Sequence, residues 1–346
     1  MQSIDVSLFV SESKHHVILD VRSPAEYAHA HIPGAVSLPL FSDEERAVVG
    51  TAYVQQSREQ AIKHGLDYFG PKMRQMVEAV EALTAEKGNK KVYVHCWRGG
   101  MRSEAVAWLL DLYGFEVSLL VGGYKAFRNW VLTSFKRPYQ LAVVGGYTGT
   151  GKTYILHQMQ QEVQVIDLEG LAGHKGSALG GIGLPPQGSQ EHFENKLAMA
   201  LAEVQIDEPI WLEDESQRIG NLNIPHDFFD QMQAAIHYFL DVPSEKRLDF
   251  LVEEYGKLPL EALKESTTRI KKRLGGLETK NVLAYLEEAD VNEAFKILLR
   301  YYDKWYRKGL ETRILDKKPV EHIKSEQVDA AANAKMVLEQ SRSKVI

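Results

Sequence analysis

The sequence predicts an α/β protein with two mainly parallel β-sheets and a mostly helical region at its C-terminal end. Apolar runs of strand length alternate with helix-like segments through residues 1–243, which is typical of strands joined by crossover helices. After residue 244 the strand-like runs give way to helical periodicity. A chain of 346 residues is longer than a single core usually requires, so we expect two domains.

The domain boundaries follow from the order of these segments. The first domain is expected at residues 1–135, with strands at 16–21, 92–95 and 117–121 and helices at 71–85 and 103–113. The second is expected at 139–243, with strands at 141–144, 163–167, 209–212 and 236–242. The Ser-Phe-Lys-Arg-Pro run at 134–138 separates them, because proline ends the preceding helix. Residues 244–346 are expected to form a mainly helical lobe associated with the second domain.

Composition narrows the function classes. No apolar run approaches bilayer length, and the N-terminus lacks a basic region followed by an apolar core, so we expect a cytoplasmic protein without a membrane partner. The net charge of −6 means that any nucleic-acid surface must be a local basic patch. The single cysteine excludes an internal disulfide, so a second nucleophile would have to come from a substrate or partner.

The one cysteine, Cys96, lies in a loop that follows a strand and opens a helix, His-Cys-Trp-Arg-Gly-Gly-Met-Arg-Ser at 95–103. Such a loop turns backbone N–H groups towards an anion at the helix N-terminus. Together with Arg98 and Arg102 it should lower the thiol pKa and favour a reactive thiolate over a buried structural cysteine. The pattern also matches the signature of cysteine phosphatases, so the loop alone leaves both chemistries open.

A second loop has the G-x4-G-K-[ST] pattern between a predicted strand and a predicted helix. We expect it to wrap a diphosphate with backbone N–H groups, with a lysine charge and a threonine hydroxyl that would bind Mg²⁺ if a metal is used; no other metal site is expected. The candidate phosphate-binding residues are Gly146, Thr148, Gly149, Thr150, Gly151, Lys152 and Thr153.

Several further residues are candidate substrate or phosphate contacts. Asp167 ends the next predicted strand, and the glycine-dense run at 170–188 is expected to be a mobile substrate loop or a linker. The 209–220 run is a predicted strand that leads into acidic residues. It lies where a Walker B strand would stand, although its pattern is not standard. Arg247 fits either a phosphate contact or a solvated helix-end arginine. The candidates besides Asp167 and Arg247 are His174, Lys175, Ser177, Glu215 and Arg218.

Two basic segments of the helical lobe are candidate RNA contacts, because basic residues interleaved with aromatics suit an RNA backbone and unstacked bases. The alternative, which the sequence alone favours, is an amphipathic helix with a solvated basic face and an aromatic core face. The candidate contacts are Arg269, Lys271, Lys272, Arg273, Arg300, Lys304 and Arg307.

Three motifs in order identify the first domain as a relative of the rhodanese superfamily. They are Asp-Val-Arg-Ser-Pro-Ala-Glu-Tyr at 20–27, His-Ile-Pro-Gly-Ala at 31–35 and Leu-Val-Gly-Gly-Tyr-Lys-Ala at 120–126. Sulfur-handling rhodaneses usually have a cysteine loop one residue shorter, whereas phosphatase relatives of the fold have this longer one. The longer loop suggests room for a phosphate-sized head group.

The rhodanese-like domain, the phosphate loop and the Trp-Leu-Glu-Asp-Glu-Ser-Gln-Arg-Ile-Gly run at 211–220 together resemble the bacterial tRNA 2-selenouridine synthases. The resemblance implies a transferase that acts on 2-thiouridine at the wobble position of tRNA. It implies geranyl transfer from geranyl diphosphate to sulfur, followed by replacement of the geranylthio group with selenium from selenophosphate. A selenophosphate synthetase would supply the selenium donor, and no bound organic cofactor is expected.

Two other function classes stay open on the sequence. One is a small-molecule P-loop kinase with a regulatory rhodanese domain, which would consume ATP without tRNA. The other is a rhodanese sulfurtransferase or phosphatase with a P-loop binding module, whose turnover would not depend on Lys152.

Overall fold

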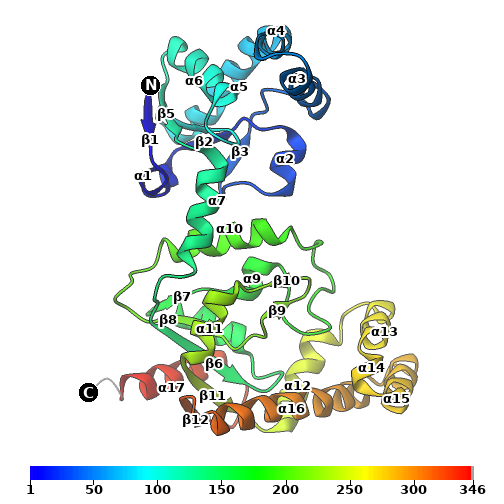
Figure 1. The fold of residues 1–346 in the computed structure, drawn as a ribbon. Helices are drawn as coiled ribbons and strands as arrows, with labels where there is room; N and C mark the ends of the chain where they lie inside the picture. Colours follow the sequence, from blue (N-terminus) through cyan, green and yellow to red (C-terminus); the bar gives the residue numbers. More distant parts are fainter. Residues whose placement is uncertain (344–346) are drawn as a thin grey trace. The chain divides into compact units, whose positions relative to one another are not determined.

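The computed structural model describes residues 1–343 and divides the chain into two compact units. The first unit contains Met1–Phe135 together with Gly188–Ala202, and the second contains Lys136–Gln187 and the chain from Glu203 onwards. Each unit has its own parallel sheet, and helices dominate the second unit after its fourth strand (Figure 1). The predicted α/β class with a C-terminal helical region is therefore confirmed.

The first sheet has the strand order β1-β5-β4-β2-β3, with every neighbouring pair parallel. Its strands are β1 (Gln2–Ile4), β2 (Val17–Asp20), β3 (Ala35–Ser37), β4 (Lys91–His95) and β5 (Glu116–Leu120). The helices of this unit are α1 (Val6–Glu12), η1 (Ser13–His15), α2 (Pro24–His29), α3 (Asp43–Gln55), α4 (Arg58–Phe69), η2 (Gly70–Lys72), α5 (Met73–Lys87), α6 (Met101–Tyr113), α7 (Gly123–Ser134) and α10 (Gln190–Leu201).

The core of the first unit forms because its central strands are buried on both faces. Val92 and Val94 of β4 and Val117 of β5 have no exposed surface and pack against α5 and α6. Continuous apolar strands of this kind are typical of parallel sheets covered by helices on both sides. The central position of β4 places its carboxyl end, where Cys96 follows, at the middle of the sheet edge.

The second sheet has the strand order β12-β11-β6-β8-β7 and is also parallel throughout. Its strands are β6 (Leu141–Gly146), β7 (Gln164–Val165), β8 (Ile210–Glu213), β11 (Ile236–Asp241) and β12 (Val320–Lys324), and β9 (Arg218–Ile219) pairs antiparallel with β10 (Leu222–Asn223). The helices are α8 (Lys152–Met159), α9 (Leu168–Ala172), α11 (His226–Ala234), α12 (Ser244–Tyr255), α13 (Leu260–Arg269), α14 (Lys271–Leu274), α15 (Gly276–Glu287), α16 (Val291–Leu315) and α17 (Ala330–Arg342).

Two segments depart from the domain boundaries expected from the sequence. Helix α10 interrupts the second unit in the sequence but packs with the first, where it contacts α7. The end of the chain is not part of a helical lobe, because β12 pairs with β11 and α17 packs against α8. The lobe itself consists of α12 to α16 around a core that includes Leu263, Val282 and Phe295.

Candidate functional site

The cysteine loop joins the end of β4 to the start of α6, as its sequence predicts. Cys96 follows His95 directly, and its side chain is 3% exposed. The loop is held by the turn before α7, since Tyr124 N–H donates to the carbonyl of Cys96 at 2.8 Å. Gly123 has a φ of +58°, and a β-carbon there would lie 2.4 Å from the Cys96 carbonyl oxygen. Only glycine therefore fits at this position, and the two loops are locked together.

The surroundings of the Cys96 sulfur favour a thiolate. The hydroxyl of Ser103, on the first turn of α6, donates to Sγ at 3.2 Å. Burial raises the pKa of the Cys96 thiol, but the hydrogen bond from Ser103, the backbone of Gly100 and Ser103 and the charge of Arg102 outweigh it, so the pKa lies below its ordinary value. A buried thiol with a lowered pKa can act as a nucleophile or hold an electrophile.

The two arginines of this loop have different environments. Arg102 donates to Glu26 Oε2 at 2.7 Å, and Arg46 contacts the same oxygen at 3.1 Å. These contacts lower the pKa of Glu26 to about 2 despite its burial, which opposes the shift. Arg98 is exposed and has no hydrogen bond or ion pair within the part of the chain that the structure describes. Arg98 is therefore available to an anion, whereas Arg102 contributes its charge from a fixed position.

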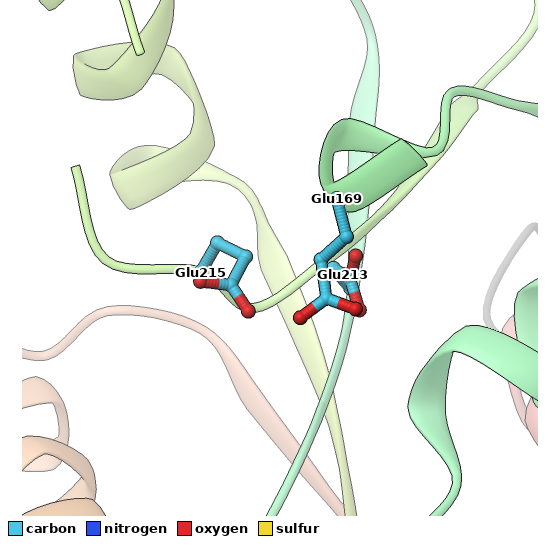
Figure 2. A group of neighbouring side chains, drawn as sticks. All are labelled: Glu169, Glu213 and Glu215. Atoms are coloured by element: carbon cyan, nitrogen blue, oxygen red, sulfur yellow. The ribbon is translucent and has the colours of Figure 1, made fainter. Parts of the chain in front are cut away.

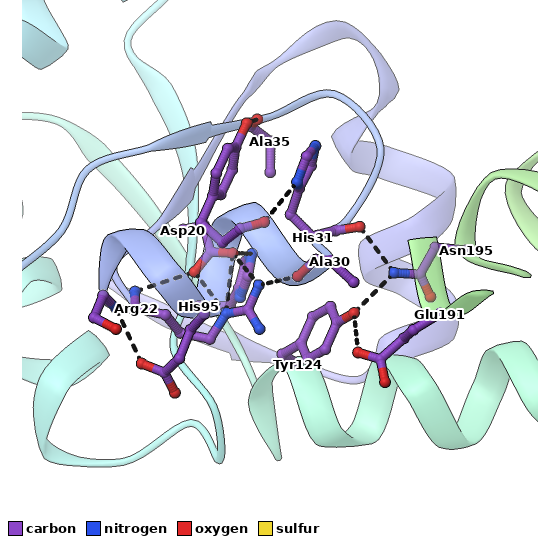
Figure 3. Close-up of polar contacts among 12 residues, drawn as sticks. Asp20, Arg22, Ala30, His31, Ala35, His95, Tyr124, Glu191 and Asn195 are labelled. Atoms are coloured by element: carbon purple, nitrogen blue, oxygen red, sulfur yellow. Dashed lines mark hydrogen bonds and ion pairs between the residues drawn. The ribbon is translucent and has the colours of Figure 1, made fainter. Parts of the chain in front are cut away.

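A buried polar network lies next to the cysteine loop and includes His95, the residue before Cys96 (Figure 3). Arg22 forms an ion pair with Asp20 and donates to the Ala30 carbonyl, and both side chains are fully buried. His95 lies 3.8 Å from Asp20, and burial lowers its pKa to about 4, so its ring is neutral. The Arg22 guanidinium also stacks on the ring of Tyr124, at 3.8 Å from its centre.

Helix α10 completes this network. The hydroxyl of Tyr124 donates to Glu191 at 2.7 Å and accepts from Asn195 at 2.8 Å, and Asn195 also donates to the His31 carbonyl. Figure 3 shows these bonds joining α10 to the loops of the first unit. Sequence reasoning misses this contribution, because α10 lies more than fifty residues beyond the first domain in the chain, and no local pattern marks its partner.

A large apolar cavity opens beside Cys96. Its volume is about 870 Å³, and α3 and α4 supply most of its apolar lining, with Val49, Tyr53, Ile62, Leu66 and Phe69 among the residues. The cysteine loop forms the other wall, where Cys96, Arg98, Met101 and Arg102 line the cavity. The reactive sulfur thus faces a space that has a charged side and an apolar side.

The second loop follows β6 and leads into α8, as the G-x4-G-K-[ST] pattern predicts. Gly149 has a φ of +83°, and a β-carbon there would lie 2.9 Å from the Arg247 carbonyl oxygen, so the residue must be glycine. Thr150 is buried, and its hydroxyl donates to the Tyr147 carbonyl at 2.9 Å, which shapes the loop from within. Lys152 Nζ donates to the Gly146 carbonyl at 3.2 Å.

Three buried glutamates gather beside the phosphate loop (Figure 2). Glu169 from α9, Glu213 at the end of β8 and Glu215 just beyond it have carboxylate oxygens within 4.8 Å of one another. The hydroxyl of Thr153 lies 3.0 Å from Glu169 Oε2 and 3.1 Å from Glu213 Oε2. Glu213 occupies the place of a Walker B acid, although only Glu215 is among the residues singled out from the sequence.

Burial and mutual repulsion raise the pKa of these carboxyls and so disfavour their charged forms. Burial, followed by the charge of Glu169, raises the pKa of Glu213 to about 8, and burial with the charge of Glu213 raises the pKa of Glu215 well above its usual range. Lys152 is the nearby cation. Burial opposes its charge, but Tyr306, Glu215 and Glu213 outweigh that effect and raise the pKa of Lys152.

The same group of oxygens fits Mg²⁺. Glu213 Oε1 is buried and has no hydrogen-bond partner among the described residues. Carboxylate and hydroxyl oxygens are the protein ligands that Mg²⁺ prefers. A cation bound by the three glutamates and Thr153 would satisfy the unpaired oxygen and relieve the repulsion between the carboxylates.

The phosphate loop opens into a pocket of about 310 Å³. Gly149, Gly151, Lys152 and Thr153 line it together with the three buried glutamates. Helices α12 and α16 add an apolar and aromatic lining that begins beside Lys152, whose Nζ lies 5.1 Å from the centre of the Tyr306 ring. The lining residues of these helices are Phe250, Leu251, Tyr255, Phe295, Leu298, Leu299, Tyr302 and Tyr306. The pocket can therefore take a ligand with a phosphorylated head and an apolar tail.

The remaining substrate candidates divide between the pocket and its surroundings. Lys175 and Ser177 line the pocket, and Lys175 forms an ion pair with Glu254 at 2.6 Å. Asp167, His174 and Arg218 do not line it. Asp167 instead caps α9 by accepting from Gly170 N–H at 2.7 Å, and Arg218 is exposed on β9, where it donates to the Gly220 carbonyl. Three of these five candidates are thus outside the pocket.

Neither expectation for Arg247 is correct. Its side chain is 3% exposed, which rules out a solvated helix end, and its guanidinium is occupied by a two-pronged ion pair with Asp303 at 2.8 and 2.7 Å. It also donates to the Thr148 carbonyl at 3.0 Å. Arg247 therefore braces the phosphate loop from outside and does not face the phosphate.

The two basic segments lie on exposed faces of the helical lobe. Lys271, Lys272 and Arg273 form the exposed part of α14, and Arg300, Lys304 and Arg307 are exposed along α16. The interleaved aromatics of α16 mostly point elsewhere, because Phe295, Tyr302 and Tyr306 line the phosphate pocket, whereas Trp305 is 51% exposed. Helix α16 is thus amphipathic, with a basic face and an aromatic face. This geometry agrees with the alternative given above, an amphipathic helix with a solvated basic face.

These features define a class of protein: a rhodanese-type domain whose loop holds a buried cysteine with a lowered pKa, joined to an α/β domain with a P-loop. Residues 10–129 match the model of the rhodanese-like domain, and residues 139–337 match the model of the tRNA 2-selenouridine synthase AAA domain. The chain belongs to the tRNA 2-selenouridine synthase family.

Curated relatives carry the same name. The tRNA 2-selenouridine synthase of Hydrogenovibrio crunogenus is 36% identical over 85% of this chain and 86% of its own length. The tRNA 2-selenouridine synthase of Bdellovibrio bacteriovorus is 36% identical over 86% of this chain and 89% of its own length. The Nitrosomonas europaea relative is 37% identical over 72% of this chain, and this match spans 65% of the relative's length. In the part of the chain that the structure describes, no helix is long and apolar enough to cross a membrane.

Proposed function

We propose that this protein is a transferase that converts 2-thiouridine at the wobble position of tRNA to 2-selenouridine in two steps at two sites. The P-loop pocket transfers a geranyl group from geranyl diphosphate to the sulfur of the uridine. The Cys96 loop then supports the replacement of the geranylthio group by selenium. Membership of the tRNA 2-selenouridine synthase family supports the overall reaction.

The observation that carries the first step is the composition of the P-loop pocket. A phosphate-binding end made by Gly149, Gly151 and Lys152 continues into a wall of leucine, phenylalanine and tyrosine side chains. Geranyl diphosphate has the matching division between a doubly phosphorylated head and an unsaturated hydrocarbon chain. Aromatic faces also stabilise the positive charge that develops on an allylic carbon as its diphosphate leaves.

In this step the C–O bond to diphosphate breaks and a C–S bond to the thiouridine sulfur forms. Lys152 and the backbone N–H groups of the loop stabilise the charge that collects on the leaving diphosphate. The tyrosines and leucines of α12 and α16 hold the chain and exclude water from the reacting carbon. A Mg²⁺ ion bound by Glu169, Glu213, Glu215 and Thr153 would neutralise further charge on the diphosphate.

The second step is assigned to the cysteine loop. Its backbone cradle and the unpaired Arg98 suit the phosphate head group of selenophosphate, which a cytoplasmic selenophosphate synthetase would supply. Selenium bonds to C2 of the pyrimidine, and the C–S bond to the geranylthio group breaks, so that geranylthiol leaves. Water then cleaves the Se–P bond and releases phosphate. Cys96 lies beside the reacting carbon in this step, and the lowered pKa of its thiol favours the thiolate form.

The tRNA is expected to contact the exposed basic residues of α14 and α16, which include Lys272 and Lys304. Several positive side chains on neighbouring helices can follow a phosphate backbone even though the whole chain carries a charge of −6.

The test is product analysis of the purified protein with thiolated tRNA. With geranyl diphosphate alone we expect S-geranyl-2-thiouridine and one free diphosphate per modified nucleoside, with no requirement for ATP. Addition of selenophosphate should convert the product to 2-selenouridine. ATP hydrolysis or transfer of the γ-phosphate to a small molecule, without geranyl transfer, would instead assign the chain to the kinases.

A further inference from the structure

The cavity beside Cys96 has an apolar wall, and binding of the selenium donor does not account for it. Helices α3 and α4 turn large apolar side chains into it, and several of these remain open to solvent: Tyr53 is 52% exposed, Val54 82% and Leu66 58%. Exposed apolar patches that line a concave surface usually mark a binding site, because a folded chain gains by burying them. An anion such as selenophosphate would gain no binding energy from contact with these apolar side chains.

The cavity is also continuous with the reactive centre. Cys96 and Met101 belong to the same lining as Ile62, Leu66 and Phe69. Its volume of about 870 Å³ lies within the range of roughly 300–1,000 Å³ that is common for ligand pockets. Arg98 and Arg102 lie on the side of the cysteine loop. One side of the cavity therefore suits an anion, and the opposite side suits a hydrocarbon.

We propose that this cavity binds the geranyl chain of the S-geranyl-2-thiouridine intermediate during the second step. The inference rests on the two-step function proposed above and adds a second prenyl-binding site, in the rhodanese-like unit. The chain is attached through sulfur to C2, the carbon that selenium attacks. A C2 atom held at the cysteine loop therefore places the start of the chain at the cavity mouth, within reach of the apolar wall.

This arrangement makes the hydrocarbon chain a specificity determinant of the selenium step. The wall of α3 and α4 would bind the geranylthio group before the exchange and hold geranylthiol as it leaves. Unmodified thiouridine lacks the chain and would bind weakly, so the enzyme would act on the prenylated nucleoside in preference to the thiolated one. Two prenyl sites would thus enforce the order of the two steps.

The experiment follows the second step alone, with tRNA that already carries either S-geranyl- or S-methyl-2-thiouridine, selenophosphate and the full-length protein. Two variants remove apolar surface from the cavity, Tyr53→Ser and Leu66→Ser. Both side chains are more than half exposed, so their loss should leave the fold intact. The matched control is Leu112→Ser on α6, because Leu112 is 68% exposed and does not line the cavity.

Wild-type protein should prefer the S-geranyl substrate by at least about 100-fold in kcat/KM, because the longer chain buries many more methylene groups. Each cavity variant should raise KM for the S-geranyl substrate by about 10-fold or more, with kcat/KM for the S-methyl substrate unchanged. Leu112→Ser should match wild type on both. Geranyl transfer from geranyl diphosphate should be normal in all three variants, which also checks their folding.

Two results would overturn the inference. The first leaves the proposed two-step function intact, and the second overturns that function as well. If wild type converts the S-geranyl substrate but both cavity variants match it on both substrates, the chain binds elsewhere and the two-step function stands. If wild type converts neither pre-alkylated substrate, the proposed function fails, and the inference fails with it.

Discussion

Replacement of Ser103 with alanine should raise the pKa of the Cys96 thiol. The hydroxyl of Ser103 is fully buried and donates to Cys96 Sγ at 3.2 Å, so water cannot take its place without opening the loop. The same hydroxyl lies 3.0 Å from the Gly100 carbonyl oxygen. One hydrogen is therefore shared between two acceptors, and the thiolate receives only part of its stabilisation.

The size of the effect follows from this geometry. A hydrogen bond to a charged group stabilises it by about 1.5–3 kcal/mol, which corresponds to about one to two pKa units. Because the proton is shared with the Gly100 carbonyl, we expect the lower end of this range, an increase of about one unit in the pKa of the Cys96 thiol. The sign is fixed: loss of a donor to the thiolate disfavours the charged form, so the variant needs a higher pH to ionise.

The assay is simple because Cys96 is the only cysteine in the chain. The rate of alkylation by iodoacetamide, followed by the mass of the whole protein between pH 5 and 10, reports the thiolate fraction directly. In Ser103→Ala the midpoint should move up by about one unit, and the plateau at high pH should stay near that of wild type.

Ser134→Ala is the matched control, since Ser134 is equally buried but bonds to the Val131 carbonyl. A midpoint that is the same in Ser103→Ala and wild type would refute the assignment of this hydrogen bond as the main cause of the lowered pKa.

Three further predictions follow from other contacts. Glu213→Gln removes a buried carboxyl whose pKa of about 8 makes its ionisation costly, so the metal-free protein should gain thermal stability above pH 8, by about 2–4 °C per kcal/mol, and should lose any stabilisation by Mg²⁺ seen for wild type in differential scanning fluorimetry. Asp303→Asn removes the partner of buried Arg247 and should cost about 3 kcal/mol in urea unfolding; unchanged stability would contradict the bracing role. A triple alanine variant of the α14 basic residues should weaken tRNA binding and flatten its salt dependence in filter-binding titrations, whereas wild-type behaviour would move the RNA surface elsewhere; the residues are Lys271, Lys272 and Arg273.

The two loops could be predicted from the sequence because each depends on a short stretch of chain. A strand, a glycine-rich loop and a helix follow one another between residues 91 and 113 around Cys96 and between residues 141 and 159 around Lys152, so residue type and spacing determine the local geometry. Seven strands of the two large sheets could be predicted for a similar reason, since buried parallel strands are continuous apolar runs, whereas β1, β3 and β12 were not predicted.

The contacts that join distant segments could not be predicted. Glu169 meets Glu213 and Glu215 only because α9 and β8 come together, and the sequence between them carries no sign of this. Arg247 fits a phosphate contact in the sequence, but its partner Asp303 lies on another helix. The aromatic residues of α16 suit either RNA or a core until the fold shows which face of the helix each occupies.

The cavity beside Cys96 has no signature in the sequence. Tyr53 and Leu66 lie on short helices of ordinary composition, and such side chains would usually be assigned to a core or to scattered surface positions. Only the packing of α3 and α4 next to the cysteine loop turns them towards one space.

The division of labour between the two sites is the central claim, and one comparison tests it most directly. Cys96→Ser and Lys152→Ala are each given selenophosphate and tRNA that already carries S-geranyl-2-thiouridine, and the nucleosides are measured by mass spectrometry. Lys152→Ala should form 2-selenouridine at a rate close to that of wild type, although it cannot geranylate thiolated tRNA, and Cys96→Ser should form none while still geranylating. If Lys152→Ala fails to convert the pre-formed intermediate, or Cys96→Ser converts it normally, the two steps are not divided between the P-loop pocket and the cysteine loop.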